Sequence, residues 1–117
     1  MRPRNRNMKG ARGACVVLVT CPTKRIAQRI ATTLVDKRLA ACVNILPDIR
    51  SIFRWEGKVD RATEILLVIK TTARRFESLR RAIRRLHPYQ VPEIIALSIT
   101  KAHPPYLAWI ARSVRLP

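Results

Sequence analysis

The sequence predicts an α+β domain of the ferredoxin-like class, an antiparallel sheet with two helices on one face. Strand-like apolar runs and helix-period patterns alternate in the order β-α-β-β-α-β, and a short helix follows. The chain has 117 residues, of which 48% are hydrophobic, so it is long enough for one domain with a buried core. We therefore expect residues 1–13 to form a flexible basic tail and residues 14–117 to form a single domain.

The first strand and helix follow directly from local patterns. Cys15–Thr20 is β-branched and continuous, which is typical of a buried strand. Thr23 is a suitable N-cap for a helix that continues to about Lys37. Apolar residues at helical spacing give this helix one inner face, made of Ile26, Ala27, Ile30, Leu34 and Val35.

Two long extended segments come next. The second strand is expected from Ala41 to Leu46, with a bend at Pro47-Asp48 before it resumes through Phe53. Trp55–Lys58 has the composition of a turn, and Glu64–Thr72 is the return strand. Strands of this length would project beyond so small a domain.

The second half repeats the helix–strand pattern. A helix is expected over Ala73–Leu86, followed by the stiff segment His87–Glu93, in which two prolines restrict the backbone. A fourth strand is expected over Glu93–Thr100, and Pro104-Pro105 begins a last helix. The inner stripe of the Ala73–Leu86 helix is Phe76, Leu79, Ile83 and Leu86.

The predicted fold leaves one sheet face without helices. Apolar residues on that face, together with the long strands near Trp55, predict self-association, because exposed apolar patches and strand edges are liabilities.

Charge is the extreme feature of the composition. The chain has 24 Lys+Arg against 7 Asp+Glu, a net charge of +17, and subtracting the five cations of residues 1–13 leaves +12. Such a field attracts polyanions. The pattern nevertheless favours solvated faces over nucleic-acid contact, although the helix arginines between Arg74 and Arg85 could bind phosphates without sequence specificity. Nucleic acid is therefore not the expected partner.

The three cysteines are Cys15, Cys21 and Cys42, an odd number without C-x-x-C spacing. Reduced thiols in a cytoplasmic protein are the simplest interpretation. No apolar run reaches the length of a membrane span, and no signal peptide is evident, so no membrane partner is expected.

Glycine content argues against nucleotide-binding and hydrolase fingerprints. With glycine only at positions 10, 13 and 57, a phosphate-cradling loop is close to excluded, and we expect no enzyme activity and no catalytic residues. Metal-ligand types are present as Cys21, Cys42, His87, His103 and Glu93, without the spacing of a structural zinc motif.

Each metal candidate has a structural alternative. Cys42 on an apolar strand is favoured as a small buried hydrophobe. Cys21 precedes a helix N-terminus, where a thiolate is favoured, and is the more accessible thiol. His87 ends a helix, where a protonated imidazole is favoured by the helix dipole.

Five blocks of this chain, spread over about residues 15–112, together resemble the CutA divalent-cation tolerance proteins. They are Arg38–Ile45, Trp55–Lys58, Ile69–Thr71, His87–Ile94 and Tyr106–Ile110. The resemblance implies a ferredoxin-like subunit that forms a homotrimer with PII-like architecture, linked to the tolerance of copper and other divalent cations. Copper is the only cofactor it implies.

The resemblance also implies a metal site and an intersubunit cleft. Family copper ligands are a cysteine near the end of the first strand and a histidine at or before the His-Pro-Tyr motif. Here those positions hold Val19, Leu86 and His87, so Cys21 would substitute for the cysteine. The expected metal ligands are His87, Cys21 and Glu93, and the expected cleft residues are Cys42, Trp55, Glu56, Lys70 and Tyr89. The alternative function is a PII-like signalling or scaffold module whose cleft binds a small anion or a protein partner.

Overall fold

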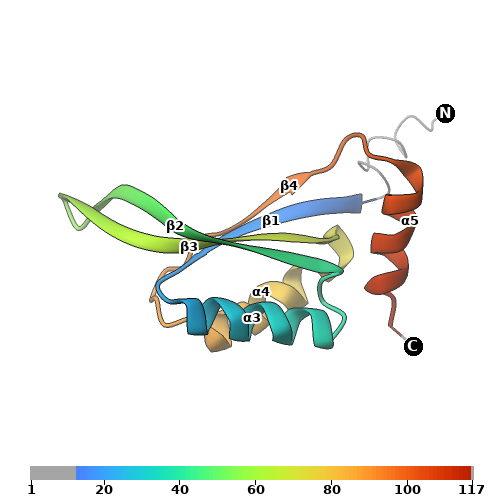
Figure 1. The fold of residues 1–117 in the computed structure, drawn as a ribbon, viewed down its shortest axis with the longest axis horizontal. Coiled ribbons are helices and arrows are strands. Elements are labelled where there is room, and N and C mark those ends of the chain that lie inside the picture. Colours follow the sequence, from blue (N-terminus) through green and yellow to red (C-terminus); the bar gives the residue numbers. More distant parts are fainter. Residues whose placement is uncertain (1–12, 117) are drawn as a thin grey trace.

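The computed structural model describes residues 13–116 and confirms the predicted element order (Figure 1). Most of the segment expected to be a basic tail, residues 1–12, lies outside the described residues. The elements are β1 (Ala14–Cys21), α3 (Lys24–Asp36), β2 (Cys42–Trp55), β3 (Lys58–Thr72), the 3₁₀ turn η1 (Ala73–Arg75), α4 (Phe76–Leu86), β4 (Ile94–Ser98) and α5 (Pro104–Ser113).

The sheet has the strand order β2-β3-β1-β4, and every neighbouring pair is antiparallel. This is the ferredoxin-like arrangement that the sequence predicts. Helices α3 and α4 cover one face of the sheet, and α5 lies against one end of it (Figure 1). None of the helices in residues 13–116 has the length and apolar character that crossing a bilayer requires.

Helix α3 begins as predicted. The Thr23 hydroxyl accepts a hydrogen bond from the Ile26 N–H at 3.2 Å, which is the N-cap interaction. Ala27, Ile30 and Leu34 are buried against the sheet. Val35 was expected on the same face but is 44% exposed, because it lies about 100° around the helix from Leu34.

Two predicted strand boundaries are wrong, and the second helix keeps its predicted bounds but has a 3₁₀ first turn. The second helix starts with the 3₁₀ turn η1, and only from Phe76 is it α-helical. Strand β3 begins at Lys58 instead of Glu64, because it pairs with β2 all the way from the hairpin turn. Strand β4 ends at Ser98, which pairs with Cys15, and beyond it only the Ile99 N–H still donates to the Ala14 carbonyl at the start of β1.

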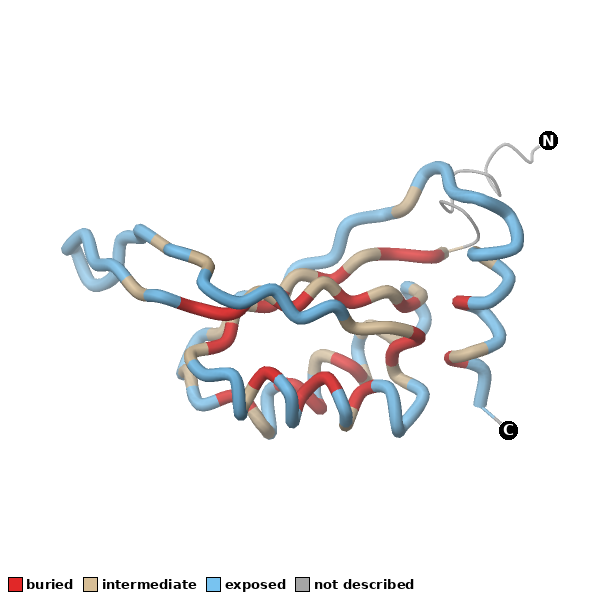
Figure 2. Tube along the Cα trace, viewed as in Figure 1, coloured by how far each residue is buried: buried red, intermediate tan, exposed pale blue. Residues whose placement is uncertain are grey.

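The core lies between the sheet and the two helices. Alternate residues of β1 and β3 point toward the helices and are almost fully buried, whereas their neighbours are half-buried or face the open side (Figure 2). The central members of this core are Val17, Val19, Cys21, Ile30, Leu34, Leu67, Ile69, Leu79 and Ile83.

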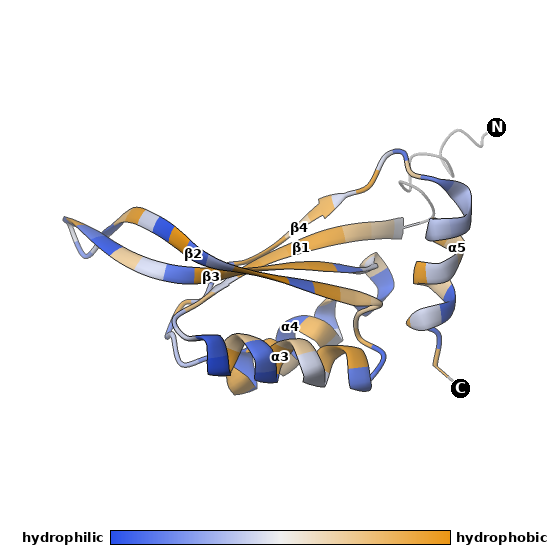
Figure 3. Ribbon diagram, viewed as in Figure 1, coloured by the Kyte–Doolittle hydropathy of each residue, from blue (hydrophilic) through white to orange (hydrophobic). Residues whose placement is uncertain are grey.

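The sheet face opposite the helices stays largely uncovered. Leu97 and Ile95 of β4 are 54% and 48% exposed, and they pair with Val16 and Leu18 of β1 on this open face. The hydropathy colouring shows apolar strands along the central sheet (Figure 3). The predicted uncovered apolar face is therefore present in the single chain.

Strands β2 and β3 form a hairpin that projects away from the helices (Figure 1). Its tip is a two-residue turn with positive φ at Glu56 (51°) and Gly57 (79°), the combination of a type I′ turn. The predicted bend appears as a register shift between Leu46 and Ile49, where Asp48 has φ 61°. The longest dimension of the molecule is 49 Å, and the radius of gyration of 15.4 Å exceeds the roughly 13 Å of a compact chain of this length.

Candidate functional site

A groove lies where the projecting hairpin meets the stiff segment after α4. Its volume is about 800 Å³. The hairpin contributes one wall, from Arg50 to Trp55 of β2 with Glu64 of β3. The other wall comes from Tyr89–Val91 and Glu93, and Thr20 of β1 also lines the groove. The fold thus brings together the two segments that stood out in the sequence.

His87 contacts two of the residues that line this groove, Thr20 and Tyr89. It is the C-cap of α4 and only 7% exposed. Its Nε2 lies 2.7 Å from the Thr20 carbonyl oxygen, and its Nδ1 accepts the Tyr89 N–H at 3.2 Å. The Tyr89 N–H thus holds one side of the ring, and the Thr20 carbonyl holds the other. Both ring nitrogens are therefore engaged within the chain.

Tyr89 and Glu64 form the central polar contact of the groove. The Tyr89 hydroxyl donates a hydrogen bond to Glu64 Oε2 at 2.7 Å, and the Tyr89 ring lies tilted against the His87 imidazole with centroids 4.8 Å apart. Glu64 is buried. Desolvation, followed by the hydrogen bond and the charge of Glu64, raises the pKa of Tyr89 well above its usual range. The phenol remains protonated and can keep donating to the carboxylate.

Sequence reasoning did not single out Glu64 as a site residue. The sequence does contain an indication of its burial, because Glu64 is an acid beside the apolar run Ile65–Ile69. A carboxylate at the start of a buried strand needs a donor. That donor comes from a segment 25 residues away in the chain, which local patterns do not reveal.

Cys21 does not have the accessible position expected of it. Its side chain is completely buried among the core residues of the helix-covered face, which it shares with Val19. Burial, with a smaller contribution from the charge of Glu64, raises the pKa of the thiol to about 11. At neutral pH Cys21 is therefore a protonated thiol, and the predicted thiolate character is wrong.

Glu93 is exposed and lines the groove, whereas His87 and Cys21 are buried and do not line it. No set of three or more His, Cys, Asp or Glu side chains is close enough to hold a metal ion within residues 13–116. In a single chain, the three candidate ligands do not form a ready metal site.

The expected cleft residues lie at two ends of the long hairpin. Trp55 and Tyr89 line the groove, and Glu56 is exposed at the hairpin turn. Cys42 and Lys70 are cross-strand partners at the other end, where the Lys70 ammonium and the Cys42 thiol both donate to the Asn44 side-chain oxygen. Cys42 is half-buried and so is less enclosed than a core hydrophobe. One chain does not bring these two groups together.

The comparisons with known proteins agree on one family. The family model described as "CutA1 divalent ion tolerance protein" matches residues 15–113. The divalent-cation tolerance protein CutA of Thermus thermophilus is 50% identical over 95 residues, which cover 81% of this chain and 92% of that protein. Protein CutA of Mus musculus is 47% identical over 92 residues, or 79% of this chain, and this match spans only about half (52%) of the mouse protein.

Solved structures resemble the fold over most of its length. The crystal structure of CutA from Xylella fastidiosa has a TM-score of 0.86 at 39% identity, covering 88% of this chain and 99% of that one. The structure of the Thermus thermophilus protein has a TM-score of 0.82 at 48% identity, covering 83% and 94%.

Proposed function

Because this chain belongs to the CutA1 divalent ion tolerance family, we propose that it is a non-enzymatic homotrimer that acts in the cellular response to divalent metal ions. The observation that carries the proposal is the position of the groove, between a projecting hairpin and the signature segment His87–Glu93. Such a hairpin is suited to contact a neighbouring subunit.

The open sheet face supports the assembly. Exposed Leu97, Ile95 and Leu46 lie on the face opposite the helices, and burying them would be favourable by about 25 cal/mol per Å² of apolar surface. Three sheets that cover one another's open faces would give the PII-like architecture that the family resemblance implies. The groove of each subunit would then border a neighbour.

Copper is the metal ion that we propose as ligand, with His87, Cys21 and Glu93 as candidate contacts. The described residues of one chain do not fit a preformed copper site, because both His87 nitrogens are engaged and Cys21 is a buried thiol. We therefore place the metal on the assembled protein, where exposed Glu93 and groups of an adjacent subunit can meet.

Mass and metal content measured on the same sample test this proposal. We expect light scattering after size exclusion to give about three times the 13.4 kDa chain mass. Titrations with Cu(I) and Cu(II) should show binding that His87→Ala weakens and His103→Ala, which alters the exposed N-cap of α5, does not. A monomer mass would contradict the trimer. Equal, negligible binding in all three proteins would contradict the copper part.

A second candidate function follows from the groove walls. Arg50 and Arg54 line the groove, and neither forms an ion pair within the described residues. Two guanidinium groups beside a partly apolar wall favour a small anion or an acidic segment of a partner protein. A thermal-shift screen with nucleotides and small dicarboxylates at millimolar concentration tests this signalling or scaffold role. Absence of any stabilising compound would count against it.

We propose the cytoplasm as the compartment. The three cysteines are free thiols in the described residues, which suits a reducing environment. Cell fractionation of the tagged full-length protein checks this, and recovery outside the cytoplasm would refute it.

A further inference from the structure

The outer surface of the helix layer carries a concentration of arginines. These residues lie on α3, η1 and α4, and all of them are exposed. We call the set the arginine face; its members are Arg25, Arg29, Arg74, Arg81, Arg84 and Arg85. The face lies on the side of the molecule opposite the open apolar sheet (Figures 1 and 2).

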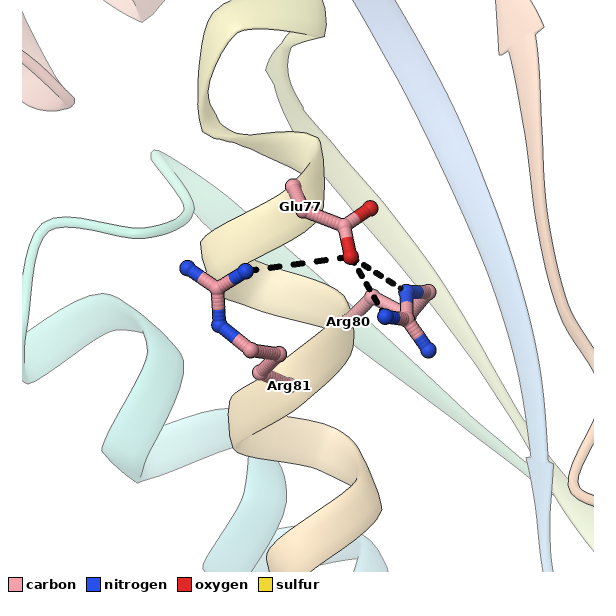
Figure 4. A network of polar contacts seen from close by, with 3 residues as sticks. All are labelled: Glu77, Arg80 and Arg81. Carbon is pink, nitrogen blue, oxygen red and sulfur yellow. Dashed lines mark hydrogen bonds and ion pairs between the residues drawn. The ribbon is translucent and has the colours of Figure 1, made fainter.

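Charge on this layer is almost entirely of one sign. Residues 24–37 and 73–86 hold ten Lys and Arg against two acids, Asp36 and Glu77, for a net charge of +8. Glu77 accepts from the side chain of Arg80 and lies 3.8 Å from Arg81 (Figure 4). Apart from this cluster, the described part of the chain has no ion pair on the arginine face. Ordinary solvated surfaces intersperse both signs, which this face does not.

Several of the arginines lie one helical turn apart on the same helix. Arg25 and Arg29 on α3, and Arg81 and Arg85 on α4, are like charges one helical turn apart, an arrangement that destabilises a helix. Each pair is separated by about 6 Å along the helix axis. An anionic polymer with repeating phosphates would relieve both repulsions at once, and guanidinium groups bind phosphate oxygens in pairs.

The chemistry of the face distinguishes between anionic polymers. Helices that bind membrane surfaces insert an apolar face, but the apolar faces of α3 and α4 are already buried against the sheet. The exposed tryptophans, on which unpaired bases could stack, lie elsewhere, at the hairpin tip (Trp55) and on α5 (Trp109). A duplex presents phosphates without requiring either apolar insertion or stacking.

We propose that the arginine face binds the phosphate backbone of double-stranded nucleic acid without base specificity. The charge pattern along the sequence favoured solvated arginines, whereas the fold puts the helical segments that carry these six exposed residues on the same face of the sheet. Self-association through the opposite sheet face would leave this surface accessible. It would also multiply the number of contacts in each assembly.

Fluorescence anisotropy with a labelled 20-base-pair DNA duplex of mixed sequence tests the proposal on the full-length protein. We expect affinity to fall steeply with salt, with a slope of log affinity against log salt of about −0.9 for each phosphate contacted. Arg84→Gln/Arg85→Gln should flatten the slope by about 2 and weaken binding on the order of 50-fold at 0.1 M salt.

The matched control is Arg61→Gln/Arg112→Gln, which removes the same charge from exposed positions on β3 and α5. It should change affinity by less than about threefold, because distant charges are screened. Both double variants retain the basic residues 1–12, so these do not affect the comparison. Circular dichroism and thermal unfolding confirm that each variant is folded.

Three outcomes would overturn the proposal. The first is that the wild type does not bind the duplex at 50 mM salt. The second is that both double variants weaken duplex binding equally. The third is that Arg84→Gln/Arg85→Gln weakens binding to vesicles but not to the duplex. For the last, co-sedimentation with phosphatidylserine-containing vesicles is measured in parallel. Vesicle binding that Arg84→Gln/Arg85→Gln abolishes, with duplex binding unchanged, would assign the face to a membrane surface.

Discussion

The hydrogen bond from Tyr89 to Glu64 is the residue-scale contact on which the groove depends. It joins β3 to the segment after α4, and it satisfies a buried carboxylate. His87 fixes the same segment through Thr20. Tyr89 and His87 therefore act first as positioning residues, and the metal proposal requires His87 to have a second role.

Removing the Tyr89 hydroxyl should destabilise the protein. Tyr89→Phe leaves Glu64 buried without its donor, which we expect to lower the free energy of unfolding by about 1–3 kcal/mol. Urea denaturation measures the loss. Tyr106→Phe on exposed α5 is the control, with an expected change within about 0.5 kcal/mol. Equal effects of the two substitutions would show that the Glu64 contact is not important for stability.

Cys21 should react slowly while the protein is folded. A pKa of about 11 instead of 9.0 leaves about 100-fold less thiolate at pH 8, and burial slows attack further. Mass-resolved alkylation should therefore modify Cys42, which is half-buried, well before Cys21. If the native protein is alkylated at both positions at similar rates, the burial of Cys21 is wrong.

Alkaline pH should weaken the fold. The folded pKa of both Cys21 and Tyr89 is raised, so above about pH 9 the unfolded chain loses protons that the folded chain retains. The stability conferred by these neutral groups is complete below pH 9, and it declines as pH rises toward 11. Denaturation midpoints at pH 8, 9.5 and 11 check this, and Tyr89→Phe should show a shallower decline. A midpoint that rises with pH would contradict the sign.

At the scale of elements, the hairpin β2–β3 is set by its turn and its register shift. The turn requires positive φ at two successive residues, and glycine supplies this without strain at only one of them. Register determines which side chains face the groove, because a shift by one residue would turn every side chain to the opposite face. Between Leu46 and Ile49, β2 has one more residue than β3. Beyond this point the alternation of β2 side chains between the two sheet faces is therefore shifted by one residue.

Substitutions at the two turn residues should differ in their effect on stability. Gly57→Ala places a Cβ in open space but at φ 79°, so conformational strain alone should cost about 1–2 kcal/mol of unfolding free energy. Glu56→Gly, at φ 51°, should relieve strain and offset its extra chain entropy. Thermal unfolding of both variants measures the difference. Stabilisation by Gly57→Ala would rule out the type I′ geometry.

At the scale of the whole molecule, two surfaces face opposite directions. One is the open apolar sheet, which includes Leu97, and the other is the arginine face on the helix layer. This separation would let the proposed assembly and the proposed polyanion binding operate independently. The projecting hairpin forms one wall of the groove. A subunit that packs against the hairpin would therefore also change the shape of the groove.

A charge on the open sheet should prevent assembly without unfolding the chain. Leu97 is 54% exposed in the single chain, so Leu97→Lys removes little core packing but would bury a charge in a trimer, at a cost of several kcal/mol. We expect the mass from light scattering to fall to 13.4 kDa. Gln28→Lys on the exposed side of α3 should leave the mass unchanged. Retention of the full mass by Leu97→Lys would exclude this face as the subunit interface.

Local patterns determined the ferredoxin-like element order, the Thr23 cap, the hairpin turn and the family, because propensity, periodicity and capping depend on neighbours within a few residues. Only the tertiary structure decided the burial of Cys21, the contact of His87 with Thr20 and the Tyr89–Glu64 bond. These depend on which distant segments meet, and the 67-residue separation between Thr20 and His87 carries no local signal. The same reason explains the arginine face. The sequence contained its charges, but the packing of α3 and α4 on the same face of the sheet brought the helices that carry them together.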